Sequence, residues 1–372
     1  MKVLVLSCNT GGGHNAAGRA ILEGFLRRDV QCEMRDALSF ASERVSKVVS
    51  DAYIRTVTVA PKLFGWCYRA GGAISSARRK SPVYLGNMMY ARALGAYVEE
   101  NRIDAVVMPH LFPAETLTHY KRRFGLRART YLVSTDYVCC PFFEETEVDR
   151  FFIPHAALVP EFVRRGIPRE KLTVTGIPVS ARYARHTPKA EARERLALPE
   201  RGNLLLVMTG SMGFGHVDRL VDAILPILEP EDHVAVLGGN NEILKKRLRE
   251  TFAWDARVQV LDFTERVDLF MDAADLLFTK PGGLTTTEAA VKGIPLIHTH
   301  PIPGCETLNM EFFGELGMSV SADTPEGLAR LAQDLLRRPE KRAAMIQRQR
   351  ENVPANAADA ICEFVLREAG EI

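Results

Sequence analysis

Short apolar runs recur along the chain, and most of them lead into a glycine, serine, threonine or proline. Runs of this length without polar alternation are typical of parallel strands that are covered on both faces. The expected strands cover residues 2–8, 104–109, 130–134, 151–154, 172–176, 203–208, 233–237, 258–261, 276–278 and 295–297. The expected helices cover residues 15–28, 155–165, 267–274, 285–292, 325–336, 339–350 and 355–368, and another begins near residue 217. Strands that alternate with helices predict an α/β fold.

The chain divides into two similar halves. At 372 residues it is too long for one ordinary core, so we expect two domains. A strand, a glycine turn and a histidine occur at residues 2–14 and recur, as a weak internal repeat, at residues 203–216. We predict a first domain over residues 1–180, a linker over 181–202, a second domain over 203–354 and a final helix over 355–372.

The composition is that of a globular protein, with 47% hydrophobic and 25% charged residues and a mean hydropathy of −0.06. No apolar run reaches the roughly 18 residues that a membrane-spanning helix needs. The run at residues 3–6 is too short for a signal-peptide core. The seven cysteines lack paired metal-ligand spacing, which indicates reduced thiols in a cytoplasm and no zinc site.

Positive charge is concentrated in the first half. The formal net charge is +10 over residues 1–185 and −8 over the remainder, which together give +2. A basic half joined to an acidic half suggests that the first half meets an anionic partner.

Residues 44–92 combine positive charge with bulky apolar side chains. The basic residues are Arg44, Lys47, Arg55, Lys62, Arg69, Arg78, Arg79, Lys80 and Arg92. The apolar and aromatic residues are Tyr53, Phe64, Trp66, Tyr68, Tyr84, Met88, Met89 and Tyr90. This mixture favours helices and a loop on an anionic membrane, where each basic side chain contributes roughly 1 kcal/mol. The alternative is a solvated helix pair packed on the sheet, whereas nucleic-acid binding lacks any recognised reader motif.

Two polar side chains follow predicted strands of the first half. His14 comes directly after Gly11, Gly12 and Gly13, at the start of the first helix, where ligands of α/β proteins collect. Asp136 follows the strand at residues 130–134 and could orient a histidine, accept a proton or cap the following segment. A histidine at this position is otherwise a capping or packing residue.

The stretch from residue 278 to residue 309 has the pattern of a ligand-binding βαβ unit. Pro281, Gly282 and Gly283 form a turn between a buried strand and a helix, where free backbone amides favour an anion. Glu288 lies about one helical turn further along, in reach of a ribose diol. A second strand then leads into a rigid loop at residues 301–306. The alternative is an ordinary βαβ unit with a tight turn.

In their order and spacing, these motifs resemble the family of monogalactosyldiacylglycerol synthases and processive diacylglycerol glucosyltransferases, over nearly the whole chain. The motifs are the Gly-Gly-Gly-His turn, Ser134-Thr135-Asp136, Thr175-Gly176-Ile177-Pro178, the loop 210–213, Lys280-Pro281-Gly282-Gly283 through Glu288, Pro303-Gly304-Cys305-Glu306 and Asn309. The resemblance implies a GT-B fold like that of glycosyltransferase family 28. In this fold two Rossmann-like domains face across a cleft, and the last helix crosses back to the first domain.

The same resemblance assigns roles to individual residues. His14 would be the general base and Asp136 its orienter or the alternative base. The donor-binding residues would be Gly210, Ser211, Met212, Gly213, Phe263, Thr264, Pro281, Gly282, Gly283, Thr285, Glu288, Gly304, Glu306 and Asn309. The residues facing the acceptor or membrane would be Gly12, Gly13, Phe64, Trp66, Tyr68, Arg78, Arg79 and Lys80. Cys305 stands where the family has glutamine, which leaves the donor sugar open.

The implied activity is an inverting transfer of a hexose from a UDP-sugar to the hydroxyl of diacylglycerol, with glucose favoured over galactose. We expect no metal and no permanently bound cofactor, because no Asp-x-Asp pair is apparent and backbone amides can hold the leaving group. The protein would lie on the inner face of the cell membrane. The alternatives are another lipid or polyprenol-linked acceptor, or a non-catalytic sensor of nucleotide sugars. Oligomeric state is not predicted.

Overall fold

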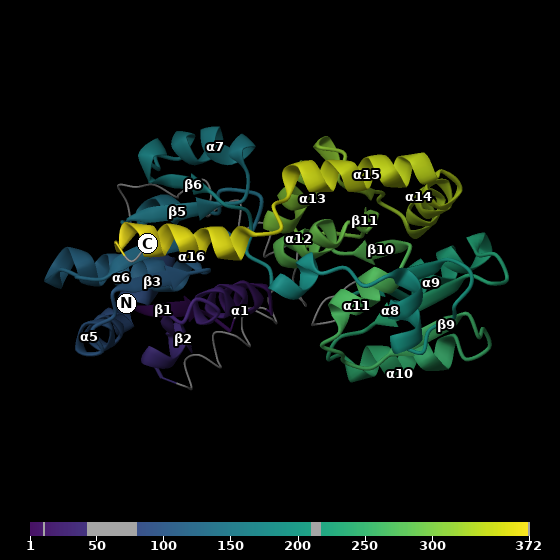
Figure 1. Cartoon of the computed structure of the whole chain (residues 1–372), viewed down its shortest axis with the longest axis horizontal. Coiled ribbons are helices and arrows are strands. Elements are labelled where there is room, and N and C mark those ends of the chain that lie inside the picture. Colours follow the sequence, from purple (N-terminus) through teal and green to yellow (C-terminus); the bar gives the residue numbers. More distant parts are fainter. Residues whose placement is uncertain (10–11, 43–79, 210–216, 371–372) are drawn as a thin grey trace. The chain divides into compact units, whose positions relative to one another are not determined.

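The computed structural model describes residues 1–9, 12–42, 80–209 and 217–370. The chain forms two compact units (Figure 1). The first unit comprises Met1–Ala181, Pro303–Cys305 and Pro354–Ile372, and the second comprises Arg182–Ile302 and Glu306–Val353.

A six-stranded parallel sheet forms the centre of the first unit, in the order β2-β1-β3-β4-β5-β6. The strands are β1 (Lys2–Ser7), β2 (Gln31–Asp36), β3 (Ala105–Met108), β4 (Arg129–Val133), β5 (Arg150–Ile153) and β6 (Leu172–Val174). The helices are α1 (Gly12–Leu26), α4 (Pro82–Asn87), α5 (Ala91–Glu100), α6 (Leu111–Phe124), α7 (Val159–Arg164) and α16 (Ala357–Glu368). Val3 pairs with Cys32 on one side and with Ala105 on the other, so β1 is an inner strand.

The last helix of the chain completes the core of the first unit. Ile361 and Val365 of α16 are fully buried in a cluster with Phe25 of α1 and Phe152 of β5. Arg28 also pairs with Asp359 at 2.6 Å. The prediction that the C-terminal helix returns to the first domain is therefore confirmed.

The second unit repeats the architecture, with a parallel sheet in the order β12-β11-β10-β7-β8-β9. The strands are β7 (Leu204–Met208), β8 (His233–Leu237), β9 (Val258–Leu261), β10 (Leu276–Thr279), β11 (Leu296–His298) and β12 (Val320–Ser321). The helices are α8 (Lys189–Arg195), α9 (Val217–Ile224), α10 (Glu242–Thr251), α11 (Val267–Ala273), α12 (Gly283–Lys292), α13 (Cys305–Glu315), α14 (Pro325–Arg337) and α15 (Pro339–Asn352). Leu277 and Phe278 are fully buried in the central strand β10, as their apolar run predicts.

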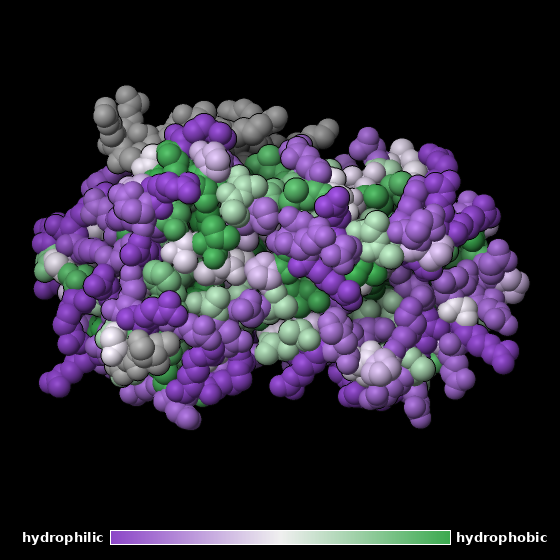
Figure 2. All heavy atoms as spheres, turned by 45° about the horizontal axis from the view of Figure 1, so that its top comes forward, coloured by the Kyte–Doolittle hydropathy of each residue, from purple (hydrophilic) through white to green (hydrophobic). Residues whose placement is uncertain are grey.

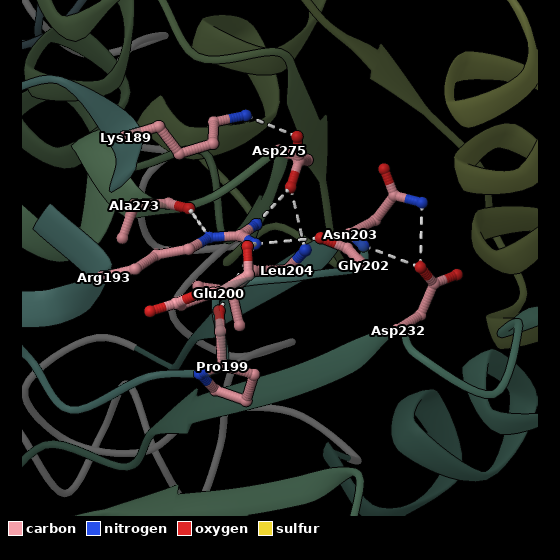
Figure 3. Close-up of polar contacts among 10 residues, drawn as sticks. All are labelled: Lys189, Arg193, Pro199, Glu200, Gly202, Asn203, Leu204, Asp232, Ala273 and Asp275. Carbon is pink, nitrogen blue, oxygen red and sulfur yellow. Dashed lines mark hydrogen bonds and ion pairs between the residues drawn. The ribbon is translucent and has the colours of Figure 1, made fainter. Parts of the chain in front are cut away.

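A network of hydrogen bonds and ion pairs lies at the amino end of the second sheet (Figure 3). Arg193 of α8 donates to the carbonyls of Glu200, Gly202 and Ala273 and pairs with Asp275 at 2.8 Å. Asp275 also accepts the backbone N–H of Leu204, the first residue of β7. The network thus joins α8 to the starts of β7 and β10, and the region predicted as a linker contributes α8 to the second unit.

Hydrophilic side chains dominate the face that Figure 2 brings forward, and apolar side chains gather in smaller areas. In the parts of the chain that the structure describes, none of the helices combines the length and apolar character needed to cross a bilayer.

Candidate active site

His14 lies at the carboxyl edge of the first sheet, in the first turn of α1. Its Nδ1 is 2.9 Å from the carbonyl oxygen of Pro109, which follows β3, and 3.0 Å from Oγ1 of Thr135, which follows β4. A carbonyl oxygen only accepts hydrogen bonds, so Nδ1 carries the proton and donates it there. The imidazole then has its lone pair on Nε2, which is the state a general base requires.

Burial keeps this imidazole neutral. It lowers the pKa of His14 to about 4, against the opposing effect of the Pro109 carbonyl. The ring of His110 lies edge-on to that of His14, with centroids 4.6 Å apart. His110 accepts the N–H of Phe112 at Nδ1 and so caps α6, and burial lowers its pKa well below the ordinary range. The site therefore holds two adjacent neutral imidazoles.

Asp136 is half-buried one residue beyond Thr135, and its backbone carbonyl accepts a hydrogen bond from Ser134 Oγ. Its role as orienter of His14 or as the alternative base stays a prediction. Sequence reasoning missed Pro109, Thr135 and His110 as the surroundings of His14. Each directly follows a strand or lies within two residues of its end, which is the signal that could have identified them.

The loop before α12 presents backbone amides at the carboxyl edge of the second sheet. The helix begins at Gly283, two residues earlier than predicted, and Gly282 is its N-cap residue. A β-carbon built on Gly282 would meet no atom nearer than 3.6 Å, namely Oε1 of Glu306. The first N–H groups of a helix have no intrahelical partners, so this turn suits an anion.

Glu306 and Asn309 fix the shape of this loop. Glu306 forms an ion pair with Lys280 and accepts the N–H of Ile302 at 2.8 Å. Asn309 is fully buried and donates its amide to the carbonyl of Pro281 at 3.0 Å. The ammonium of Lys280 lies 3.9 Å from the position of a β-carbon on Gly282. Lys280 therefore adds a cation beside the helix N-terminus, although sequence reasoning had not assigned it a binding role.

Glu288 is half-buried on α12, and Tyr183 is its neighbour. The pKa of Tyr183 is raised by burial and by its hydrogen bond to the Glu288 carboxylate. Burial opposes the shift, but Tyr183 and, more weakly, Asp268 and Glu288 raise the pKa of Arg182. Tyr183 comes from the segment that precedes α8, far from Glu288 in sequence, and no sequence signal pointed to it. The ribose role of Glu288 stays a prediction.

Two further predicted donor residues follow the carboxyl end of β9. Phe263 is 61% exposed, and Thr264 accepts the N–H of Arg266 at 3.0 Å through Oγ1. An exposed aromatic ring at this edge of the sheet is available for stacking on a base. The donor-binding roles of Phe263 and Thr264 stay predictions.

The remaining predicted donor residues are placed differently. Pro281 is buried and Thr285 is half-buried in the first turn of α12. Gly304 has a φ of 123°, a backbone conformation that favours glycine, and Cys305 begins α13. Gly210, Ser211, Met212 and Gly213 lie outside the described residues.

The residues predicted to face the acceptor or membrane are described only in part. Gly12 and Gly13 form the start of α1. Lys80 is exposed, with Nζ 5.1 Å from the centroid of the Tyr84 ring. Phe64, Trp66, Tyr68, Arg78 and Arg79 lie outside the described residues.

Within the stretch predicted to face the membrane, residues 44–92, the prediction is wrong for two aromatic residues. Tyr84 and Tyr90 are buried in the first unit, where the hydroxyl of Tyr90 donates to Asn87. Their rings pack in the protein core because α4 and the following turn lie against α6. Leu85 and Met89 are exposed instead, at 50% and 86%.

Two protein families match the chain, one in each of the two compact units. Residues 14–179 match the family described as Monogalactosyldiacylglycerol (MGDG) synthase. Residues 188–352 match the family described as Glycosyl transferases group 1.

Named relatives cover nearly the full chain. The processive diacylglycerol beta-glucosyltransferase of Bacillus subtilis (strain 168) is 26% identical over 373 residues, which are 99% of this chain and 95% of that protein. The protein of the same name from Bacillus pumilus (strain SAFR-032) is 25% identical over 371 residues, with the same coverage.

Solved structures share the fold. MurG of Acinetobacter baumannii has a TM-score of 0.65 at 16% identity, covering 98% of this chain and 99% of that one. Anabaena Alr3699/HepE in complex with UDP-glucose has a TM-score of 0.59 at 14% identity, covering both chains completely. The predicted GT-B class, with two Rossmann-like domains, and the family resemblance are confirmed.

Proposed function

Since the chain joins an MGDG synthase domain to a glycosyl transferases group 1 domain, we propose that it transfers glucose from UDP-glucose to the hydroxyl of diacylglycerol. Its full-length relatives named processive diacylglycerol beta-glucosyltransferase support this acceptor and this sugar. The observation that carries the proposal is the neutral His14, whose Nε2 is left unprotonated by the contact of Nδ1 with Pro109.

In the proposed reaction, Nε2 of His14 takes the proton of the acceptor hydroxyl. The oxygen of that hydroxyl attacks the anomeric carbon, the bond from this carbon to the diphosphate oxygen breaks, and UDP leaves with inversion at the carbon. A positioned base of this kind contributes about 10²- to 10⁴-fold to the rate. Thr135 and Pro109 hold the ring by its other nitrogen.

The charge of the departing diphosphate would fall on the start of α12. The amides near Gly282 and Gly283 and the ammonium of Lys280 supply positive potential there. This arrangement supports a reaction that needs no metal, and unchanged turnover in the presence of a chelator would test it. Glu288, oriented by Tyr183, would accept hydrogen bonds from the ribose hydroxyls.

The acceptor is a membrane lipid, so the protein must reach a bilayer. We propose that it does so peripherally, on the inner face of the cell membrane, through residues 44–92 without the buried Tyr84 and Tyr90. The residues that would face the membrane include Phe64, Trp66, Tyr68, Arg78, Arg79 and Lys80. Binding would then require anionic lipid and weaken with salt. Flotation with anionic and with neutral vesicles tests this, and equal binding to both would contradict it.

The decisive experiment measures UDP release from UDP-glucose and from UDP-galactose, with and without diacylglycerol in anionic micelles. We expect lipid-dependent release with UDP-glucose and a loss of about 10²- to 10⁴-fold in His14→Ala. His119→Ala, on the half-exposed part of α6, is the matched control and should retain activity.

Other outcomes would select the alternatives. Faster UDP release from UDP-galactose than from UDP-glucose would identify galactose as the transferred sugar. UDP release that does not depend on diacylglycerol would point to another lipid or polyprenol-linked acceptor. UDP binding without turnover of either sugar would indicate a non-catalytic sensor.

A further inference from the structure

A buried histidine lies beneath the loops of the second sheet's carboxyl edge. His298 is the last residue of β11 and is fully buried. Its Nε2 is 3.2 Å from Oγ1 of Thr286 on α12, and its Nδ1 is 3.1 Å from Oγ of Ser319, just before β12. Its ring also packs against Phe313 of α13, with centroids 5.8 Å apart. One side chain therefore contacts three separate elements.

The protonation state of the His298 ring allows it to hold the elements that it contacts in fixed positions. Burial lowers the pKa of His298 to about 3, so the imidazole is neutral at neutral pH. A neutral imidazole has one donor and one acceptor, and each hydroxyl can take either role, so both ring nitrogens are satisfied. Buried polar groups with all partners in place fix geometry, because any displacement leaves a donor or acceptor unpaired.

The contacted helices are the two that begin at the proposed donor site. Thr286 is fully buried in the first turn of α12, next to Thr285 and three residues after Gly283. Its neighbour Thr287 donates to the carbonyl of Gly283 at 2.6 Å. Phe313 belongs to α13, which also carries Glu306 and Asn309. A shift at His298 would therefore move the first turn of α12 against the loop that Asn309 holds.

We propose that His298 is a positioning residue for the sugar nucleotide, holding the first turn of α12 where its amides meet the diphosphate. The proposal rests on the proposed function, in which this turn binds the diphosphate. His298 touches neither substrate nor reacting atoms in this role. Its effect on binding passes through Thr286, whereas its contact with Ser319 serves stability alone.

The two hydroxyls on the same ring provide the test. UDP affinity is measured by titration calorimetry on full-length Thr286→Val and Ser319→Ala, together with their unfolding temperatures. Both variants lose one buried hydrogen bond to His298, so both should unfold at a lower temperature. Thr286→Val should bind UDP about tenfold more weakly than wild type, the size expected when a buried hydrogen bond no longer fixes the binding turn. Ser319→Ala should bind UDP with wild-type affinity.

Variants of His298 itself sharpen the test. The side-chain amide of glutamine reaches the position of Nε2, and that of asparagine reaches the position of Nδ1. His298→Gln should therefore restore the contact with Thr286 and bind UDP nearly as wild type does, whereas His298→Asn should resemble Thr286→Val. The KM for the lipid acceptor should stay unchanged in all of them, which a general loss of structure would not allow.

Equal UDP affinity in Thr286→Val and Ser319→Ala would overturn the inference, whether both were weakened or both were unchanged. If wild type itself failed to bind UDP, the proposed function would fail first. Wild-type binding of UDP together with full affinity in Thr286→Val would reject the role of His298 alone. Where a His298 variant does not fold, the two hydroxyl variants still decide the outcome.

Discussion

Each end of the second sheet has a basic side chain paired with an acidic one, but the surroundings of the two pairs differ. At the amino end, Arg193 and Asp275 have side chains 4% and 12% exposed, and their hydrogen bonds run to backbone groups at the end of α11, in the segment before β7 and at the start of β7 (Figure 3). At the carboxyl end, Lys280 and Glu306 are 21% and 12% exposed. That pair lies beside glycines and the start of α12.

We infer that the first pair stabilises the fold, whereas the second pair lies at the proposed site for an anionic ligand. Backbone carbonyls and amides satisfy the polar groups of Arg193 and Asp275, so these groups stabilise the starts of the strands. The glycine turn and helix N-terminus leave amides for an anion. Changes at the amino end should therefore alter the free energy of unfolding, and changes at the carboxyl end should alter UDP affinity.

The largest effect is expected from Arg193→Met. The change leaves Asp275 with Lys189 and the Leu204 amide, and it removes the donors of at least three backbone carbonyls. Removing one partner of a buried pair costs about 3–5 kcal/mol of unfolding free energy. Denaturant titration measures the loss, and UDP affinity of the folded protein should stay within about twofold of wild type. If Arg193→Met had wild-type stability but bound UDP poorly, the amino end of the sheet would serve binding and the inference would be wrong.

A smaller effect, on binding instead of stability, is expected from Glu288→Gln. An amide cannot replace the charge-assisted hydrogen bonds of a carboxylate to a ribose diol. We expect UDP to bind about 10- to 100-fold more weakly, equivalent to about 1.4–2.8 kcal/mol. The free energy of unfolding should change by less than about 1 kcal/mol, because the side chain is half-exposed and its amide still accepts from Tyr183.

The control for that experiment varies the number of phosphates on the ligand. UMP, uridine and UDP share the ribose, so Glu288→Gln should weaken all three by a similar factor. A loss confined to UDP would place Glu288 at the diphosphate and contradict the ribose assignment.

Gly282→Ala should have a smaller effect again. The backbone of Gly282 has a φ of −73°, which alanine adopts freely, and the nearest atom to the added β-carbon is 3.6 Å away. The unfolding free energy should therefore change by less than about 0.5 kcal/mol. The methyl group would occupy space above the amides, so UDP should bind about 3- to 10-fold more weakly, a loss of about 0.7–1.4 kcal/mol.

Gly314→Ala is the matched control, because a β-carbon there meets no atom within 4 Å. This glycine lies inside α13, so alanine should stabilise the helix by about 0.5–1 kcal/mol and leave UDP affinity unchanged. Full UDP affinity in Gly282→Ala would mean that the diphosphate does not approach this turn.

The fold could be predicted from the apolar runs because parallel strands are buried on both faces and so read as unbroken apolar segments. Leu204–Met208 and Leu276–Thr279 are examples, and both form inner strands. The strand Gln31–Asp36 was missed because it lies at the edge of the sheet, where its polar side chains reach solvent. Helix starts were placed too late at Gly12 and Gly283, because glycine has a low helix propensity and reads as a turn.

The sequence could place candidate site residues together where one motif supplies several of them in a single segment, although their roles stay predictions. Gly282, Gly283 and Glu288 belong to one turn and its helix, so local sequence places them together. The partners of His14 come from the ends of two other strands, β3 and β4, and Tyr183 reaches Glu288 from another segment altogether. Such contacts depend on tertiary packing, which local periodicity does not encode.

His14 extends the comparison to the first sheet and gives the smallest expected effect, a shift in a pH profile. Its pKa of about 4 lies below the ordinary 6.5, so the ring stays in its basic form well below neutral pH. The acid limb of kcat/KM should therefore bend near pH 4 to 5, about two units below that of an unperturbed histidine. The lowered pKa also makes stability depend on pH. As pH falls from 6.5 towards 4, His14 becomes protonated in the unfolded chain but stays neutral in the folded chain. The free energy of unfolding therefore decreases over this range. UDP-release rates and denaturant midpoints measured across pH 4 to 8 test both signs. An acid limb centred near 6.5 would mean that another group, or a solvated His14, is the base.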